Sequence, residues 1–356
     1  MGTVTSSPAA PGSRLASRLG FSDRVFIGPA ARRVARQIED GLDLVEGGLA
    51  EELRVADSIA DASARYLYEA GGKRIRPVLT LLTAQLGEGN IPAVIDIAKA
   101  LEMTHLGSLY HDDVMDGADR RRGVPAAHAV WGNSVAILTG DILFSRASQL
   151  MSRHGDRAIR LQADTFERLV MGQLHETVGA QDGDDPIEFY IQVLADKTGS
   201  LIAAATQGGA IFSNAPTEYE EPLRVYGEKV GVAFQLLDDV IDLSADPAET
   251  GKVPGTDLRA GVPTMPYLLL KAEQDAASAE LAARIDDGVT RIAEGADPVI
   301  LDQPLAELRD HAVTQKTLEL ARTWTSDAIA ALAPLPKGPV REALMRFAES
   351  LADRSS

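Results

Sequence analysis

The sequence predicts an all-α protein, a single-domain bundle of about a dozen helices, and three observations support this fold class. Apolar residues recur every three or four positions, as in Ile38, Leu42, Val45 and Leu49, which is the spacing of an amphipathic helix. Only 5% of residues are aromatic, and the alternating β-branched runs typical of strands are scarce. Glycine and proline gather at a few points, which divide the chain into helical segments.

The helical pattern runs from about residue 29 to residue 351, and turn signals separate its segments. The breaks fall at residues 71–72, 87–90, 182–186 and 214–216. The longest irregular stretch covers residues 246–263, and loops of that length in compact domains are usually functional or disordered. Because no repeat or convincing linker interrupts the pattern, we expect residues 25–356 to form one domain. Residues 1–24 are rich in Ser, Pro, Gly and Ala, which predicts a flexible tail.

Composition excludes several classes of function. The chain has no Cys, so disulfides, thiolate catalysis and Cys-based metal sites are absent. It carries 35 basic and 52 acidic residues, a net charge of −17, and we therefore expect no nucleic-acid partner. No apolar run approaches the roughly 18 residues of a membrane span, and the N-terminus lacks the apolar centre of a signal peptide. We expect a cytoplasmic protein without a membrane span.

Two acidic clusters share the pattern DDxxD, and each ends an apolar helical run. Their members are Asp112, Asp113 and Asp116 in the first cluster, and Asp238, Asp239 and Asp242 in the second. The outer aspartates of each cluster are four residues apart, so they share one face of a helix, where their charges repel. Mg²⁺ relieves such repulsion, because it takes oxygen ligands and bridges carboxylates to substrate phosphates. A solvated acidic helix end is the alternative, but two copies on apolar helices favour a magnesium site.

Basic residues are also clustered, although the protein is acidic. Residues 71–77, GGKRIRP, break one helix and begin another, and Pro77 suits the first turn of the second helix. Lys73 and Arg76 therefore lie beside a helix N-terminus, whose free amides favour anions. The other clustered cations are Arg120, Arg121, Arg122, Lys197 and Lys252. Each alone is typical of a surface cation, but together with two metal clusters they predict a cavity for more than one diphosphate.

This ordered set of motifs resembles the trans-type polyprenyl diphosphate synthases, prenyltransferases that elongate isoprenyl chains. The matching segments are GGKRIRP (71–77), THLGSLYHDDVMD (104–116), RRG (121–123), GD (140–141), KTGSL (197–201), FQLLDDVID (234–242) and GKVPGTDL (251–258). The resemblance covers residues 30–350 and implies the isoprenoid synthase fold, helices around a central cavity. It also implies an enzyme that ionises an allylic diphosphate with the help of Mg²⁺. The cation then condenses with isopentenyl diphosphate, and a proton is lost.

The resemblance further implies the roles of single residues. The metal-bridging aspartates are Asp112, Asp116 and Asp238, and Asp113, Asp239 and Asp242 shape or join the coordination shell. The positions that hold isopentenyl diphosphate are Lys73, Arg76, His105 and Arg122. Those that grip the allylic diphosphate are Arg121, Lys197 and Lys252, with Thr198 and Gln235 beside the developing cation and its leaving group. The catalytic set is Asp112, Asp116, Asp238, Lys197 and Arg121, and the released diphosphate accepts the proton.

Two of these assignments carry an open alternative. His105 lies on an apolar helix, where a lone histidine is more often a structural core residue; its place seven residues before Asp112 favours function. Arg120–Arg122 is ambiguous by one residue, and we align it on Gly123. One position departs from the family, since Val262 stands where many relatives carry a second lysine of the allylic site.

Small residues before the first acidic cluster predict a long product. Ser108 and Gly107 lie four and five residues before Asp112, roughly 6–7.5 Å along the helix, with Thr104 one turn deeper. In the family a bulky aromatic residue at this depth stops chain growth, so we expect a medium- or long-chain all-trans product, such as a quinone side-chain precursor. The alternative is that Gly107 and Ser108 only allow close helix packing.

Four other functions stay open at this point. A class I terpene cyclase would also ionise an allylic diphosphate, but it needs no second diphosphate site. A short-chain synthase of the geranylgeranyl type is a second alternative. A non-catalytic subunit of a heteromeric synthase is disfavoured because all six aspartates are retained, and an acidic helical scaffold leaves the ordered motifs unexplained. From the resemblance we expect a homodimer.

Overall fold

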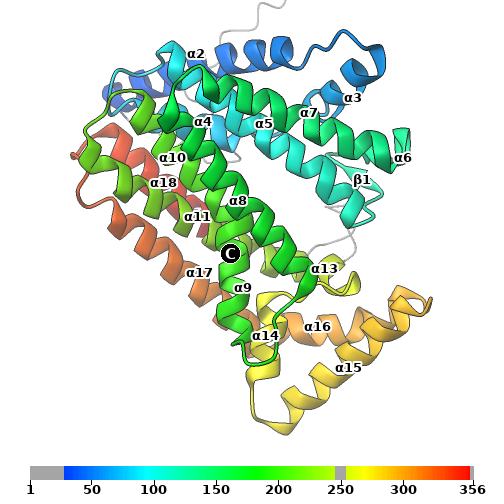
Figure 1. Cartoon of the computed structure of the whole chain (residues 1–356). Helices are drawn as coiled ribbons and strands as arrows, with labels where there is room; N and C mark the ends of the chain where they lie inside the picture. Colours follow the sequence, from blue (N-terminus) through cyan, green and yellow to red (C-terminus); the bar gives the residue numbers. More distant parts are fainter. Residues whose placement is uncertain (1–27, 245–253, 353–356) are drawn as a thin grey trace, which may run out of the picture. The chain divides into compact units, whose positions relative to one another are not determined.

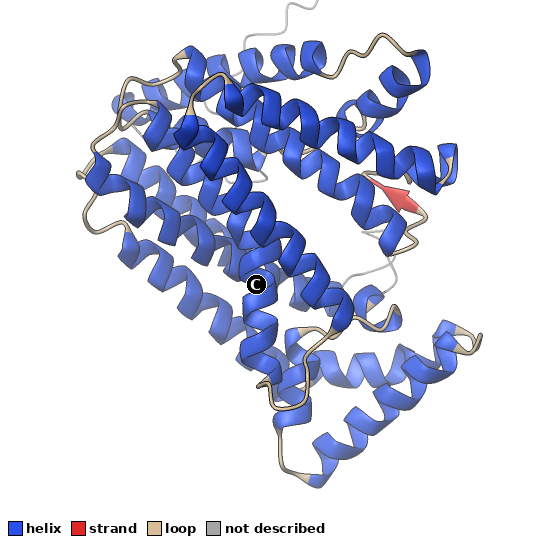
Figure 2. Cartoon of the chain, viewed as in Figure 1, coloured by secondary structure: helices blue, strands red, loops and turns tan. Residues whose placement is uncertain are grey.

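The structure, a computed structural model, describes residues 28–244 and 254–352 of the 356-residue chain. These residues are helical almost throughout, and the strands among them are the short β1 (Arg120–Arg121) and β2 (Val124–Pro125) (Figure 2). This confirms the all-α fold class. None of the helices in the two described ranges has the length and apolar character needed to cross a lipid bilayer. The predicted tail, residues 1–24, and the candidate Lys252 lie outside the described residues.

The chain divides into two compact units, and each is described by itself. The first unit takes the chain through Glu167, together with Leu201–Gly227 and Ala331–Phe347. The second takes Arg168–Ser200, Glu228–Ala330 and the chain from Ala348 onward. Among the helices that contribute residues to both units are α8 (Asp156–Val178), α10 (Ser200–Phe212) and α11 (Glu220–Ser244). The single domain over residues 25–356 stays a prediction.

In the first unit α5 (Pro92–Met115) lies beside α7 (Asn133–Ser152) (Figure 1). Over most of its length α5 is buried on several faces, as expected for a helix that is apolar all round. A Cβ atom added at Gly140 of α7 would come within 3.0 Å of the carbonyl oxygen of Gly107, so the two backbones pack closely. The other elements of this unit are α2 (Pro29–Glu52), α3 (Ser58–Glu69), α4 (Ile75–Ala84), α6 (Ala127–Trp131), the 3₁₀ turn η2 (Thr217–Tyr219) and α18 (Pro339–Ala352).

Local sequence explains where these helices begin. The apolar stripe of α2 is buried along its length, which confirms the spacing seen in the sequence. The carboxylate of Asp57 accepts hydrogen bonds from the amides of Ile59 and Ala60 and caps α3. The predicted break at residues 71–72 is confirmed, because α3 ends at Glu69 and α4 begins at Ile75.

The second unit is also helical. It contains α9 (Pro186–Leu194), the π-helical turn η1 (Ala195–Gly199), α13 (Thr256–Arg259), α14 (Met265–Ala272), α15 (Ala276–Ala293), the 3₁₀ turn η3 (Pro298–Leu301), α16 (Asp302–Asp310) and α17 (Ala312–Ala331). Leu243, near the end of α11, belongs to one buried apolar cluster with Leu258, Leu270, Ile285 and Leu305. The segment of α11 that carries the second acidic cluster is therefore anchored on α13–α16.

Candidate active site

The first acidic cluster ends α5, and its three carboxylates differ in environment. Asp116, the C-terminal cap of the helix, is exposed, and Asp112 is half-buried. Asp113 is fully buried, and one of its carboxylate oxygens accepts a hydrogen bond from Nε of Arg121 at 2.6 Å. Burial raises the pKa of Asp113, and the positive charge of Arg121 opposes that rise. Asp113 therefore holds Arg121 in place, and the outer aspartates lie nearer the surface.

Two neighbouring arginines of a β-hairpin, Arg121 and Arg122, bind different partners. Strands β1 and β2 are joined by Arg122 and Gly123, with φ angles of 51° and 80°. Positive φ at both positions is typical of a type I′ turn, the preferred two-residue hairpin loop. Arg121 pairs with Asp113, whereas Nη1 of Arg122 donates to the carbonyl oxygens of Leu67, at 2.8 Å, and Gly71. With the motif aligned on Gly123, Arg121 is therefore the arginine bound to a carboxylate, and Arg122 is the one beside the turn before α4.

A buried ion pair supports this turn. Arg74, the residue before α4, is 5% exposed and has φ of 53°. Its Nη1 lies 3.1 Å from a carboxylate oxygen of Glu102 on α5, which is 1% exposed. Sequence reasoning assigned roles to neighbours of Arg74 but to neither member of this pair. The available signal was a glutamate within the apolar run of residues 97–106, because a charge there needs a buried partner.

Several predicted cations gather around His105 in the first unit. Burial lowers the pKa of His105 well below its ordinary value, and the charges of Arg76 and Arg122 lower it further. Burial also lowers the pKa of Arg76 to about 10. Nε of Arg76 is buried without a hydrogen-bond partner among the residues that the structure describes. Lys73 is exposed in the turn before α4. This concentration of donors and positive charge, with a neutral imidazole, suits a polyanionic ligand.

The second acidic cluster repeats the pattern of the first. Asp238 is exposed, Asp242 is half-buried and Asp239 is 1% exposed. The Asp239 carboxylate accepts hydrogen bonds from the Tyr190 hydroxyl, at 3.0 Å, and from the amide of Met265, at 2.9 Å. Burial raises the pKa of Asp239 to about 8. In both clusters the second aspartate is therefore enclosed by the fold, and the outer two lie nearer solvent.

The remaining candidates of the second unit lie close together. Lys197 and Thr198 are part of the π-helical turn η1. The Lys197 ammonium forms an ion pair with Glu176 of α8, and the Thr198 hydroxyl donates to the side-chain oxygen of Gln235 on α11 at 3.4 Å. The unit thus brings together Lys197, Thr198 and Gln235, three of the residues that the resemblance assigned to the allylic substrate. Lys252, assigned to the same substrate, is outside the described residues.

Comparisons with known proteins identify the family of this chain. A family model described as polyprenyl synthetase matches residues 57–294. The chain belongs to this family. It is 42% identical over 321 residues to the nonaprenyl diphosphate synthase of Mycobacterium tuberculosis, which covers 90% of this chain and 94% of that protein. It is 33% identical over 313 residues to the octaprenyl diphosphate synthase of Escherichia coli, which covers 87% of this chain and 94% of that protein.

A solved structure supports the same conclusion. The geranylgeranyl pyrophosphate synthase of Corynebacterium glutamicum, in complex with calcium and isoprenyl diphosphate, superposes with a TM-score of 0.80. It is 39% identical, and the match covers 93% of this chain and 99% of that one. The resemblance drawn from the motifs is confirmed, as is the expectation of an enzyme, a polyprenyl diphosphate synthase.

Within this synthase the predicted chain-length positions have different surroundings. A Cβ atom at Gly107 would lie 3.0 Å from the Phe144 ring and 3.2 Å from the carbonyl oxygen of Gly140, so close helix packing accounts for this glycine. Thr104 is fully buried and accepts a hydrogen bond from the amide group of Gln162 on α8 at 2.9 Å. The hydroxyl of Ser108 donates to the carbonyl oxygen of His105. The roles of Gly107, Ser108 and Thr104 in chain length stay predictions.

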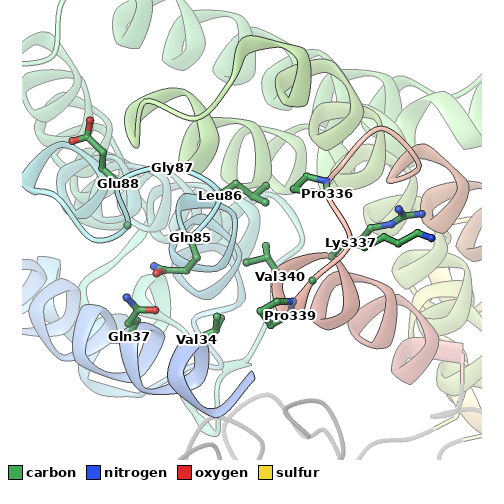
Figure 3. A pocket seen from close by; sticks show the side chains of 13 residues that line it. Val34, Gln37, Gln85, Leu86, Gly87, Glu88, Pro336, Lys337, Pro339 and Val340 are labelled. Carbon is green, nitrogen blue, oxygen red and sulfur yellow. The ribbon is translucent and has the colours of Figure 1, made fainter. Parts of the chain in front are cut away.

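A pocket of the synthase lies away from the predicted residues. It has a volume of about 400 Å³ and is lined by α2, by the turn after α4, and by the turn before α18 with the start of that helix; Gln37, Gln85 and Lys337 are among the lining residues (Figure 3). The pocket is near the start of α5, because Gly89 of its lining is three residues before Pro92. Asp112 follows 20 residues after Pro92, about 30 Å along the helix, so the first acidic cluster is at the other end of α5. No predicted site residue lines this pocket.

Proposed function

We propose that this synthase condenses isopentenyl diphosphate with an allylic diphosphate and releases a medium- or long-chain all-trans polyprenyl diphosphate, a quinone side-chain precursor. Family membership supports the reaction class. The two relatives with long-chain names, at 42% and 33% identity, support the product length. The observation that carries the proposal is the cation cluster around His105, where a buried guanidinium nitrogen of Arg76 has no partner among the described residues.

The cation cluster of the first unit would hold isopentenyl diphosphate. Lys73, Arg76 and Arg122 supply positive charge, and guanidinium groups match the geometry of phosphate oxygens. A bound diphosphate would also favour protonation of His105, because its negative charge offsets the arginines that lower the pKa. Binding of its diphosphate at this cation cluster would hold the double bond of isopentenyl diphosphate in place, and the acidic clusters would take no part in that binding.

The allylic diphosphate would be gripped by the residues of the second set. Lys197, Thr198 and Gln235 lie together in the second unit, and Arg121 is held by Asp113 in the first. The ion pair of Lys197 with Glu176 would be exchanged for one with the diphosphate. The Thr198 hydroxyl and the Gln235 amide would lie beside the developing allylic cation. The released diphosphate would accept the proton lost in the final step, since no side chain is assigned that role.

The outer carboxylates fit a divalent cation, and we propose that it is Mg²⁺. The proposed ligands are Asp112 and Asp116 of the first cluster and Asp238 of the second, with Asp242 as a further candidate, and carboxylate oxygens are the hard donors that Mg²⁺ prefers. In residues 28–244 and 254–352 no three His, Asp or Glu side chains gather closely enough to hold a metal alone. Calcium together with isoprenyl diphosphate in the Corynebacterium glutamicum synthase supports a divalent ion. When bound, Mg²⁺ would neutralise charge on the departing diphosphate.

We also propose a cytoplasmic homodimer. Large apolar side chains are exposed on α7, where Ile137 is 40% and Leu138 is 60% exposed, and a second copy would cover them. Light scattering of the purified chain tests the dimer, and a monomer at micromolar concentration would contradict it.

One incubation tests the proposed reaction. The purified chain is mixed with Mg²⁺, labelled isopentenyl diphosphate and, in turn, dimethylallyl, geranyl, farnesyl or geranylgeranyl diphosphate, and the products are sized. We expect several additions to a primer, giving chains beyond geranylgeranyl diphosphate. Asp238→Asn should abolish incorporation, and Asp182→Asn, an exposed loop carboxylate, should leave it unchanged. Geranylgeranyl diphosphate as the sole product would indicate the short-chain alternative, and no incorporation would contradict the proposal.

A further inference from the structure

The π-helical turn η1 joins α9 to α10 and carries Lys197 and Thr198. Helical turns with i→i+5 bonding are rare; they occur mostly as single turns within α-helices and are frequent at functional sites. A rare local geometry persists when the surrounding structure favours it over the ordinary α-helix. The neighbours that hold this turn therefore determine where Lys197 and Thr198 lie.

One arginine of α8 holds the turn and connects it to α11. Nε of Arg168 donates to the Asp196 carboxylate at 2.7 Å, and its Nη1 donates to the Glu228 carboxylate at 2.6 Å. Its Nη2 lies 3.4 Å from the carbonyl oxygen of Ala195. Asp196 is 8% exposed, and its other oxygen accepts from Gln192 at 2.7 Å. The planar fork of a guanidinium is needed for this set of bonds, because a lysine ammonium cannot reach all three acceptors at once.

Two glycines let the flanking helices approach the turn backbone. A Cβ atom at Gly172 of α8 would lie 2.6 Å from the amide nitrogen of Lys197. A Cβ atom at Gly231 of α11 would lie 2.5 Å from Cα of Gly199. Real Cβ contacts are longer than this, so any side chain at either glycine would displace the turn. The turn is enclosed by backbone from both helices.

All these contacts come from one stripe of each helix. On α8 the contacting residues are Arg168, Gly172 and Glu176, spaced by four, and on α11 they are Glu228, Gly231 and Gln235, spaced by three and four. Such spacing places each set on a single helix face. The last residue of the α8 stripe, Glu176, is the ion-pair partner of Lys197. The last residue of the α11 stripe, Gln235, accepts the hydrogen bond from Thr198.

We propose that Arg168 is a positioning residue of the synthase. Through Asp196 and Glu228 it fixes η1 between α8 and α11, so that Lys197 and Thr198 are set for the diphosphate of the allylic substrate. This inference rests on the proposed function, and it adds a determinant of allylic-substrate use that none of the sequence motifs contains.

Steady-state kinetics of Arg168→Lys test the proposal. This variant keeps the charge and loses the fork. We expect kcat/KM for the allylic substrate to fall about 10- to 100-fold, as a misplaced binding group produces, while KM for isopentenyl diphosphate stays within about twofold. Gly172→Ala displaces the same turn without removing any charge, and it should give the same selective loss. The matched control is Arg157→Lys, because Arg157 also lies on α8 and pairs with a glutamate of α11, Glu220, and it should leave both constants unchanged.

A double-mutant cycle separates positioning from a merely structural role. If Arg168 acts through Lys197, Arg168→Lys should add little to the loss caused by Lys197→Ala, whereas independent effects multiply. Multiplicative losses would overturn the proposal, and so would an equal fall in the use of both substrates. A lowered Tm with unchanged allylic kinetics would overturn it as well. Failure of the proposed function is a separate outcome, since the wild-type chain would then elongate no allylic primer.

Discussion

Removal of the Glu102 carboxylate should destabilise the synthase strongly. Glu102 and Arg74 form an ion pair of 3.1 Å, and their side chains are 2% and 3% exposed. Glu102→Ala would leave the buried Arg74 guanidinium with only the more distant carboxylate of Glu46, 3.8 Å from its Nε, as counter-charge, close to the other arginines of the cluster. Breaking a buried pair in this way costs about 3–5 kcal/mol of unfolding free energy.

Two further variants separate charge from shape. Glu102→Gln keeps an oxygen that accepts from Arg74 but removes the negative charge, and the lost charge-assisted bond should cost about 2 kcal/mol. Arg74→Met with Glu102→Leu removes both charges and fills the space with apolar atoms. The double variant should lose much less than Glu102→Ala alone, because no fully buried charge is left unpaired.

Denaturant unfolding followed by circular dichroism measures these free energies. The control is Glu307→Ala, which breaks the solvent-exposed pair of Arg284 and Glu307 and should change the midpoint little. A Glu102→Ala variant within about 1 kcal/mol of wild type would refute the reasoning. A double variant whose loss equals the sum of its single losses would refute it too, because the two side chains would then be energetically independent.

Three other predictions concern pH, product length and metal. Because the pKa of His105 is lowered in the folded state, the unfolded state takes up its proton first as the pH falls below about 6.5, and stability is lost there. His105→Gln should therefore lose less Tm than wild type between about pH 6.5 and pH 5, and equal losses would contradict the assignment. Ser108→Phe should shorten the product, and an unchanged product distribution on sizing would mean that the growing chain does not pass Ser108. Removal of divalent cations with EDTA should abolish condensation and added Mg²⁺ should restore it; turnover that persists in EDTA would contradict the metal proposal.

Much of the fold could be predicted from sequence because its signals are local. Helical periodicity depends on neighbours three and four residues apart, and the stripe from Ile38 to Leu49 is buried as that periodicity requires. The break between α3 and α4 follows from two adjacent glycines and from Pro77. The hairpin of β1 and β2 could not be predicted, because strands of two residues have no periodicity to detect.

The sequence predicts which types of residue form the site more readily than it predicts how those residues are arranged in space. The DDxxD pattern makes its first two aspartates look alike, yet Asp239 is enclosed by partners 49 and 26 residues away, Tyr190 and Met265. The same limit applies to Arg168, whose acceptors lie 28 and 60 residues further along the chain. Which carboxylate is buried, and which arginine orients a turn, depends on tertiary contacts that one sequence does not display.

The hairpin register has a consequence for the two arginines that it carries. Arg120 opposite Pro125 and Arg121 opposite Val124 leave two residues for the reversal, so each side chain's direction is set by counting from the turn. Adjacent positions on a ribbon point to opposite sides, and insertion of a single residue exchanges the sides. One added residue after Gly123 would shift β2 against β1 and exchange the sides to which Val124 and Pro125 point. Arg120 and Arg121 therefore have the same side chain but point to opposite sides of the hairpin, because they are adjacent positions of one strand.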